Sequence, residues 1–314
     1  MRRLHQGEQV VARESLRSRP GTRSRTKLAI NDGVRFTHPD RVYWVDVGIT
    51  KRDLAEYYRY VWDWMAPHLA GRPLALVRCP DGTKGECFFQ KHLSAGLAEH
   101  TLRIVTDSKG RQVIAVDDLS GLLSLVQAGV LEVHVRGSTI NRLDLCDRIV
   151  FDLDPGDGLS WSAVVAAARD MRERLNTLKL ESFIKLSGGK GLHVVVPIVR
   201  TEWDRVKAFV QAFAQKMALD RPERYVAKVA KSIRRERIFV DYLRNSLEQT
   251  SIAAYSTRAR PGAPVSTPIA WEELGRTIGG DQYTVRNLKK RLGRLKRDPW
   301  SDISRVQQTL PDSR

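Results

Sequence analysis

The stretch Arg148-Ile149-Val150-Phe151-Asp152-Leu153-Asp154-Pro155-Gly156 contains two aspartates, one residue apart, at the end of an apolar run. The run predicts a β-strand, in which side chains alternate between faces, so Asp152 and Asp154 should project from the same side. Pro155 and Gly156 suit a tight turn that ends the strand. At ~4 Å, two like charges repel by about 4 kcal/mol at an effective dielectric near 20, and a divalent cation binding both oxygens removes that repulsion. The pair therefore predicts a cation site.

A third acid strengthens this prediction. Asp241 lies in the apolar run Ile238–Tyr242, where a charge is costly unless it is paired. An ion pair with Arg237 or Arg244 would explain it equally well. However, two acids on one strand and a single acid on another form a familiar layout for phosphoryl and nucleotidyl transfer, in which two metals activate a hydroxyl and stabilise the leaving group.

A glycine-rich segment, Ser187-Gly188-Gly189-Lys190-Gly191-Leu192-His193, lies between two predicted strands. Glycine lets the backbone approach a ligand closely, and Lys190 can neutralise phosphate charge. The segment is not a P-loop because no helix follows it, and an ordinary glycine-rich hairpin would look similar. Arg258 and Arg260 are spaced to face one way and suit a triphosphate, although a solvated loop explains them nearly as well. His193 and His134 lie in apolar strands, where a core histidine is the alternative.

The charge of the chain indicates a polyanionic partner. The 314 residues carry a formal net charge of +17, and basic residues concentrate in residues 1–30 and 286–297. Clustering of this kind favours nucleic acid over a merely soluble basic surface. Residues 1–27 are rich in Arg, Ser and Gly and predict a disordered basic tail or linker, with order beginning near Leu28. No apolar run approaches the ~20 residues that a membrane helix needs, and the N-terminus lacks the apolar core of a secretory signal.

The cysteines give a different kind of information. There are three, Cys79, Cys87 and Cys146, and an odd count with irregular spacing argues against a disulfide framework and for a reducing compartment. Cys79 and Cys87 with His92 and His100 could form a zinc site, but their spacing matches none of the common patterns.

Hydrophobic periodicity predicts alternating helices and strands from residue 50 onward. The expected helices are 50–69, 119–128, 161–178 and 203–219, with a basic helix near the C-terminus that places Leu288, Leu292 and Leu295 on one face. The expected strands are 74–77, 113–116, 131–135, 148–154, 183–186, 192–198 and 238–242. Strands and helices that interleave in this way predict an α/β or α+β fold with mixed sheets flanked by helices.

Several of these segments, in order, resemble the polymerase domain of bacterial DNA ligase D, which belongs to the archaeo-eukaryotic primase superfamily. The resemblance runs from about Val34 to Trp300, so residues 28–314 are expected to form a primase-polymerase domain. It rests on the segments FTHPDRVYW (36–44), GITKRDLAEYY (48–58), GECFFQKH (85–92), FDLDPG (151–156), SGGKGLHVVVP (187–197), IFVDYLRN (238–245) and AYSTRARPGAPVSTP (254–268).

The resemblance implies a role for each matching residue. The metal-binding catalytic acids would be Asp152, Asp154 and Asp241. The residues around the incoming nucleotide and its triphosphate would be His134, Ser187, Lys190, His193, Arg258 and Arg260. The pocket for a 5′-phosphate on the downstream strand of a gap would be His38, Arg41 and Lys51, although the family often has Asn and Lys at the first two positions. Phe88 or Phe89 would stack on a template base, a sequence-tolerant contact.

The resemblance also implies an activity and a setting. The implied enzyme is a nucleotidyltransferase that uses two Mn²⁺ or Mg²⁺ ions to add dNTPs or rNTPs to a primer at gaps and broken DNA ends in non-homologous end joining. It would work in the bacterial cytoplasm, near the nucleoid, with the end-binding protein Ku and a DNA ligase activity. The sequence shows no Lys-x-Asp-Gly nucleotidylation motif, so either a free-standing polymerase or a domain of a larger ligase is expected. A primase that starts chains de novo and a non-catalytic module that bridges DNA ends are the alternatives.

Overall fold

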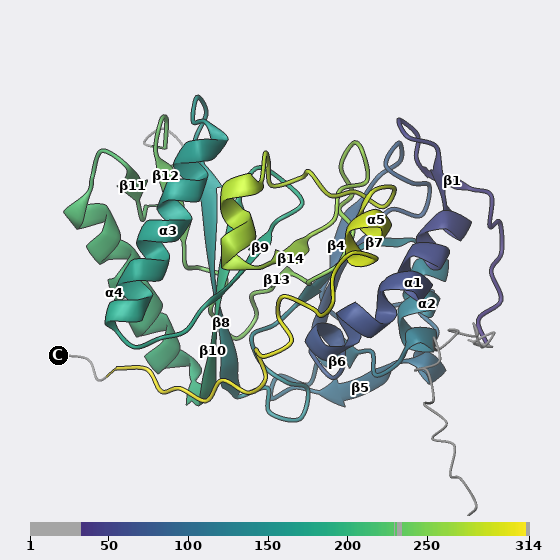
Figure 1. Ribbon diagram of the computed structural model, residues 1–314. Coiled ribbons are helices and arrows are strands. Elements are labelled where there is room, and N and C mark those ends of the chain that lie inside the picture. The colour runs from purple at the N-terminus through teal and green to yellow at the C-terminus, as the bar shows by residue number, and fades with distance from the viewer. Residues whose placement is uncertain (1–32, 229, 231–233, 312–314) are drawn as a thin grey trace, which may run out of the picture. The chain divides into compact units, whose positions relative to one another are not determined.

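The computed structural model describes residues 33–311 except 229 and 231–233. The predicted tail 1–27 and the expected start of order near Leu28 lie outside these residues. Within them the fold is a mixed α/β arrangement, as the sequence predicted, with a six-stranded sheet, a four-stranded sheet and two small two-stranded sheets (Figure 1). In the part of the chain that the model covers, no helix is long and apolar enough to cross a membrane.

The six-stranded sheet carries the two aspartates. Its strands, in spatial order, are β11 (Tyr225–Val226), β12 (Ile238–Asp241), β8 (Leu145–Pro155), β10 (Leu192–Glu202), β9 (Phe183–Leu186) and β14 (Thr267–Ile269). Neighbouring strands are antiparallel except β11 and β12, which are parallel. The acid-bearing strand β8 is therefore an interior strand and ends at Pro155, as predicted.

The two faces of β8 differ in a way that explains the site. Helices α3 (Trp161–Thr177) and α4 (Trp203–Asp220) cover one face of this sheet (Figure 1). Alternate residues of β8 are buried in the core on that face, namely Ile149, Phe151 and Leu153. On the other face, Val150 joins a second core, and Asp152 and Asp154 follow where that apolar packing stops. The strand thus supplies carboxylates at the edge of an apolar layer.

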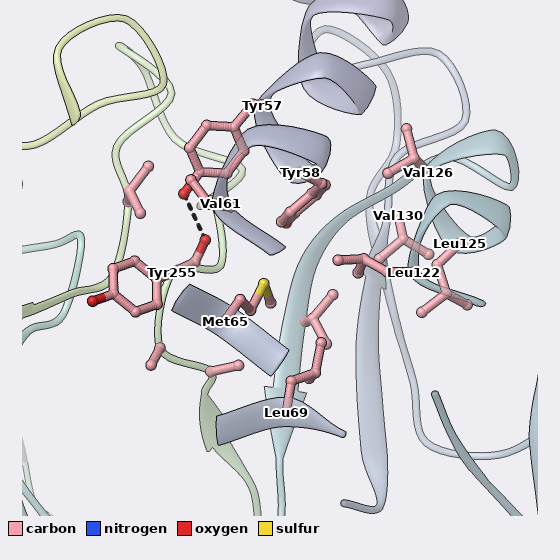
Figure 2. Close-up of a cluster of buried hydrophobic side chains, with 14 of the residues drawn as sticks. Tyr57, Tyr58, Val61, Met65, Leu69, Leu122, Leu125, Val126, Val130 and Tyr255 are labelled. Carbon is pink, nitrogen blue, oxygen red and sulfur yellow. Dashed lines mark hydrogen bonds between the residues drawn. The ribbon is translucent and has the colours of Figure 1, made fainter. Parts of the chain in front are cut away.

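The second core surrounds the four-stranded antiparallel sheet. Its strands, in spatial order, are β13 (Ser251–Ile252), β7 (Val130–Val135), β3 (Leu74–Arg78) and β4 (Phe88–Gln90). Helices α1 (Lys51–Leu69) and α2 (Leu119–Gln127) pack here, and Figure 2 shows side chains of α1 close to the aliphatic side chains of α2, while Tyr57 points toward Tyr255. The Tyr57 hydroxyl donates to the Tyr255 carbonyl at 2.7 Å, which fastens α1 to the segment that leads to Arg258.

The predicted long elements are present with small changes at their ends. Thr50 caps α1 through a capping box with Asp53, in which each side chain bonds the other residue's backbone N–H. The predicted basic helix is shorter than expected, because α5 (Leu288–Leu292) ends before Leu295. The remaining elements are short: β1 (Val42–Trp44), β2 (Ile49–Thr50), η1 (Glu99–Thr101), β5 (Arg103–Thr106), β6 (Gln112–Ala115) and η3 (Trp271–Arg276).

The argument against a disulfide was wrong. Cys79 and Cys87 are bonded to each other, with their Cα atoms 4.4 Å apart, and Cys146 is buried with a free thiol. The cause is the antiparallel pairing of β3 with β4, which brings the end of one strand opposite the start of the next. An odd count leaves one thiol over but does not prevent the other two from pairing. The disulfide also rules out the zinc site, because both sulfur ligands are used.

Candidate active site

Strand register brings the three predicted acids together. Asp241 on β12 is paired directly with Asp152 on β8, and His193 on β10 is paired with Asp152 from the other side. Asp154 lies two residues further along β8 and therefore points to the same face. The cross-strand row thus places two carboxylates and an imidazole on three adjacent strands, with a third carboxylate beside them.

Basic groups surround these carboxylates. Arg244 Nε lies 3.4 Å from Asp241 Oδ2, and Arg244 Nη2 lies 3.8 Å from Asp152 Oδ2, so the predicted ion pair with Arg244 is present. His193 Nε2 is 3.5 Å from Asp152 Oδ2, and Arg234 Nη1 is 3.7 Å from Asp154 Oδ2. The side chain of Arg244 is 42% exposed, so solvent and ligands can reach it.

Burial has the largest effect on the pKa values of Asp152 and His193 in this row. Burial raises the pKa of Asp152 to about 6; the charges of Asp241 and Asp154 add to the rise, and Arg244 opposes it. The pKa of His193 lies well below its usual value because of burial and the nearby positive charges of Lys185 and Arg244. A carboxyl held above its normal pKa by burial and like charges is one that an additional cation would stabilise in its ionised form.

The donor set suits a hard divalent ion. Three carboxylates offer only oxygen ligands, which Mg²⁺ and Mn²⁺ prefer. In the described part of the chain, no three His, Cys, Asp or Glu side chains are already arranged to hold a metal. Arg244, close to both Asp152 and Asp241, instead supplies the positive charge. The backbone positions of the three aspartates fit a cation site. For an ion to bind there, the side chains of Asp152 and Asp241 would have to turn away from Arg244.

The glycine-rich turn lies against the strand that carries Asp152 and against the loop between β13 and β14, which carries Arg258 and is called the Arg258 loop below. Gly188 has a φ of +69°, and a Cβ there would lie 2.7 Å from Arg258 Cγ, so only glycine fits this turn beside the arginine. A Cβ on Gly191 would lie 2.3 Å from the Leu153 carbonyl oxygen. Arg258 Nη1 donates to the Ser187 carbonyl at 2.7 Å. The structure therefore joins the turn, β8 and the Arg258 loop at one place.

The other predicted nucleotide contacts differ in exposure. The guanidinium of Arg260 lies beside Gly189, and a Cβ there would be 3.0 Å from its Nη1. Lys190 is largely exposed, with Nζ 3.7 Å from Asp157. Such a surface pair contributes little stability and leaves Lys190 free to bind an anion. Ser187 is buried, and its hydroxyl donates to the Gly191 carbonyl within the turn.

The four-stranded sheet contributes a second group of side chains. His134 on β7 lies 2.8 Å from Glu132 through Nε2, and its ring meets the Phe89 ring edge-on at 5.5 Å between centroids. Phe88 and Phe89 on β4 are 43% and 50% exposed, and the cationic side chains of Arg78 and Lys91 lie over their rings. Burial lowers the pKa of His134, although Glu132 opposes this.

The three residues of the predicted 5′-phosphate pocket gather at the start of α1. The Arg41 N–H donates to the His38 carbonyl, and the Lys51 N–H donates to the Arg41 carbonyl at 2.8 Å. Lys51 is buried, and its Nζ donates to the Thr37 carbonyl at 2.9 Å. Arg41 contacts the loop before β4 through Asp81 at 3.0 Å. An anion at this place would lie at the N-terminus of a nineteen-residue helix, where the helix dipole favours it.

Sequence reasoning missed two buried charged residues of the site. Glu132 and Lys185 lie in apolar strands, at positions 132 and 185, and each is almost fully buried. A signal was available: Glu132 alternates with His134 on one face of its strand, in the same spacing as the two aspartates of β8. Lys185 is paired with His193 across β9 and β10, and burial together with Arg258 lowers its pKa well below the usual value.

Comparison with known proteins places this chain in a family. The model for "LigD, primase-polymerase domain" matches residues 50–300, which is most of the chain. The chain belongs to the LigD primase-polymerase domain family. It is therefore an enzyme of the polymerase type, a nucleotidyltransferase. This confirms the resemblance seen in the sequence and the predicted fold.

Relatives and a solved structure agree with this assignment. The chain is 37% identical, over 97% of its length, to a multifunctional non-homologous end joining protein LigD from Pseudomonas aeruginosa, and 34% identical, over 77% of its length, to one from Mycolicibacterium smegmatis. It covers 37% and 32% of those proteins, so it spans about a third of their length. A structure titled as the polymerase domain from Mycobacterium tuberculosis ligase D in complex with DNA matches with a TM-score of 0.79 and 29% identity, covering 88% of this chain and 99% of that one.

Proposed function

We propose that this chain is a metal-dependent polymerase that extends a primer 3′-hydroxyl at gaps and broken DNA ends in non-homologous end joining. The observation that carries the proposal is the row of Asp241 and Asp152 on paired strands, with Asp154 on the same face, beside the Arg258 loop. The LigD relatives, which are named for end joining, support the biological setting. By the same relationship, Ku and a ligase activity are the proposed partners.

Each group of residues has a proposed part in the reaction. Asp152, Asp154 and Asp241 would hold two Mn²⁺ or Mg²⁺ ions, which when bound activate the attacking hydroxyl and stabilise the leaving pyrophosphate. The incoming nucleotide would be bound by His134, Ser187, Lys190, His193, Arg258 and Arg260. The positive charges of Lys190, Arg258 and Arg260 would offset the triphosphate charge, and the set would keep the α-phosphate in reach of the primer.

The proposed DNA contacts lie on β4 and at the start of α1. Phe88 or Phe89, exposed on β4, would stack on a template base. His38, Arg41 and Lys51 at the start of α1 would bind a 5′-phosphate on the downstream strand. A polymerase that holds both a primer end and a downstream 5′-phosphate would act on short gaps, which is the substrate we propose.

Primer extension tests the proposal directly. The purified chain is given a labelled primer annealed across a one- to five-nucleotide gap bearing a 5′-phosphate, all four NTPs or dNTPs, and Mn²⁺ or Mg²⁺. We expect gap filling with at least one ion and none in EDTA. Failure to incorporate nucleotides with either ion would overturn the proposal. Full-length products on single-stranded template without any primer would instead show a primase.

A further inference from the structure

Glu132 is a buried carboxylate that contacts three groups of the proposed nucleotide site. Its Oε2 lies 2.8 Å from His134 Nε2. Its Oε1 accepts the Ala259 backbone N–H at 2.8 Å and lies 3.1 Å from Arg258 Nε. The Arg258 guanidinium then reaches across to the Ser187 carbonyl at 2.7 Å. One carboxylate on β7 thus links the four-stranded sheet to the Arg258 loop and, through Arg258, to the glycine-rich turn.

The free-energy cost of burying these charges indicates that Glu132 does more than stabilise the fold. Taking a carboxylate and a guanidinium out of water costs several kcal/mol per ion, and well-packed apolar residues often replace such a pair without loss. Glu132 is 6% exposed, in a strand whose other residues are mostly aliphatic. What an apolar residue could not do there is fix the direction of a guanidinium and an imidazole. Both groups are proposed triphosphate ligands, and their geometry decides how tightly a nucleotide is held.

We propose that Glu132 is a positioning residue for the incoming nucleotide, setting the orientation of Arg258 and His134 toward the triphosphate. This inference rests on the proposed function, because it takes the ligand of these two side chains to be a nucleoside triphosphate. Without the Glu132 charge, Arg258 loses its only carboxylate contact in the described residues, near the buried cation Lys185. The guanidinium would then turn away from its present position, and the glycine-rich turn would lose its connection to β7 through Arg258.

The test compares Glu132→Gln and Glu132→Asp with a matched control, Asp170→Asn. Asp170 on α3 is also a buried carboxylate contacted by three donors: Arg174 at 3.0 Å, Arg221 at 3.2 Å and the Tyr225 hydroxyl at 2.8 Å. Its helix, α3, covers the face of the six-stranded sheet that is turned away from the four-stranded sheet (Figure 1). Loss of fold stability alone should therefore affect both variants, whereas loss of nucleotide positioning should affect only Glu132.

Steady-state gap filling, binding of gapped DNA and thermal unfolding are measured for each variant. We expect Glu132→Gln to raise the KM for the nucleotide about 10- to 100-fold, the effect of a misplaced positioning group, with DNA affinity changed less than about twofold. Glu132→Asp, which keeps the charge, should recover part of the loss. Asp170→Asn should leave the nucleotide KM unchanged even where its melting temperature falls. A nucleotide KM for Glu132→Gln within twofold of the wild type would overturn the inference.

A double-mutant cycle tests whether Glu132 acts through Arg258. If it does, Glu132→Gln should raise the KM by a clearly smaller factor in an Arg258→Ala background than in the wild-type background, because the two changes share one interaction and only the contact with His134 is left to lose. Fully multiplicative effects would contradict positioning through Arg258. Should Glu132→Gln fail to fold, the same comparison is made with Glu132→Asp. A wild-type chain that fills no gaps refutes the proposed function itself, a result separate from any change in KM.

Discussion

At the scale of single residues, the site depends on charges held where water is largely excluded. Asp152 illustrates the balance: burial raises its pKa to about 6 although Arg244 lies nearby. Its partner across the ladder, Asp241, is also buried and shares the same arginine. A divalent cation bound by the two carboxylates would take the place of the Arg244 guanidinium beside them. This leads to the first prediction.

Asp152→Ala should lower the rate of nucleotide incorporation at least about a thousandfold, because it removes a carboxylate that is proposed to bind the metal together with Asp241. Binding of gapped DNA should stay within about threefold of the wild type, since the phosphate-binding residues are elsewhere. Gap filling and fluorescence anisotropy measure the two quantities. Extension by this variant at a rate near the wild type would contradict the assignment.

The pH dependence of stability should report on Glu132. Burial alone would raise its pKa, but the His134 hydrogen bond and the Arg258 charge lower it to about 2, from 4.5. A depressed carboxyl pKa stabilises the fold above pH 4.5 and loses that contribution as the pH falls toward 2. The difference in unfolding free energy between wild type and Glu132→Gln should therefore narrow below pH 4.5, by up to about 3 kcal/mol. Denaturant titrations at several pH values measure it, and a pH-independent difference would refute it.

Lys51→Ala should remove the preference for gaps with a 5′-phosphate. Lys51 is the buried cation at the start of α1, and its Nζ has no carboxylate contact in the described residues. The affinity ratio between phosphorylated and unphosphorylated gaps should fall to about 1 in this variant. Arg52→Ala is the matched control, because Arg52 is the next residue but is exposed and paired with Asp40. An unchanged ratio in Lys51→Ala would place the pocket elsewhere.

At the scale of elements, hydrophobic periodicity predicted the helices and strands that form by burying a continuous apolar face. The strand 183–186 was predicted with the bounds that β9 has, and α1 and α3 differ by one residue at an end, because each presents a continuous apolar face. The short strands β4, β5 and β14 were missed, since β4 and β5 lack a continuous buried apolar run and β14 contains a proline. The same limit applies to the site: motifs indicated Asp152 and Arg258, but the contacts of Glu132 depend on how two sheets meet.

The β3–β4 hairpin gives a prediction that belongs to this scale. The Cys79–Cys87 bond closes a loop of 8 residues, and a loop of that size stabilises a fold by up to about 2.5 kcal/mol in the chain-entropy account. Replacing both cysteines with Ser should lower the unfolding free energy by up to that amount under oxidising conditions. Under a dithiol reductant the wild type should lose the same advantage. Equal stability of oxidised and reduced wild type would contradict this.

The same bond should influence template binding. Phe88 follows Cys87 directly, and Arg78, the residue before Cys79, packs against the Phe88 ring at 5.5 Å. Opening the loop would remove the covalent link between β3 and the residue that precedes Phe88, and leave β4 held by its pairing with β3 and by side-chain packing. Reduction should therefore weaken binding to gapped templates more than it changes binding to blunt duplex DNA, which lacks an unpaired base for stacking.

At the scale of the whole molecule, charge and fold serve different purposes. The net charge of +17 says nothing about topology, but it creates a field that attracts DNA over distances longer than any contact. Affinity that comes from neutralising phosphates is driven by the release of condensed counterions, which is less favourable at high salt, so this affinity must fall as salt is added. Specificity for a gap would have to come from short-range contacts instead, which we propose at the start of α1 and on β4.

Salt titrations separate these two contributions. For five to six phosphate contacts, the plot of log K against log salt should have a slope of about −4 to −6, from ~0.9 counterions released per contact. A gap with a 5′-phosphate should give a slope steeper by about 1 than the same gap without it, because Lys51 and Arg41 then contact one more anion. Fluorescence anisotropy from 50 to 400 mM NaCl on both substrates measures this. A slope shallower than −1 would show that the basic surface does not hold DNA, and equal slopes would show that the 5′-phosphate is not bound by cations.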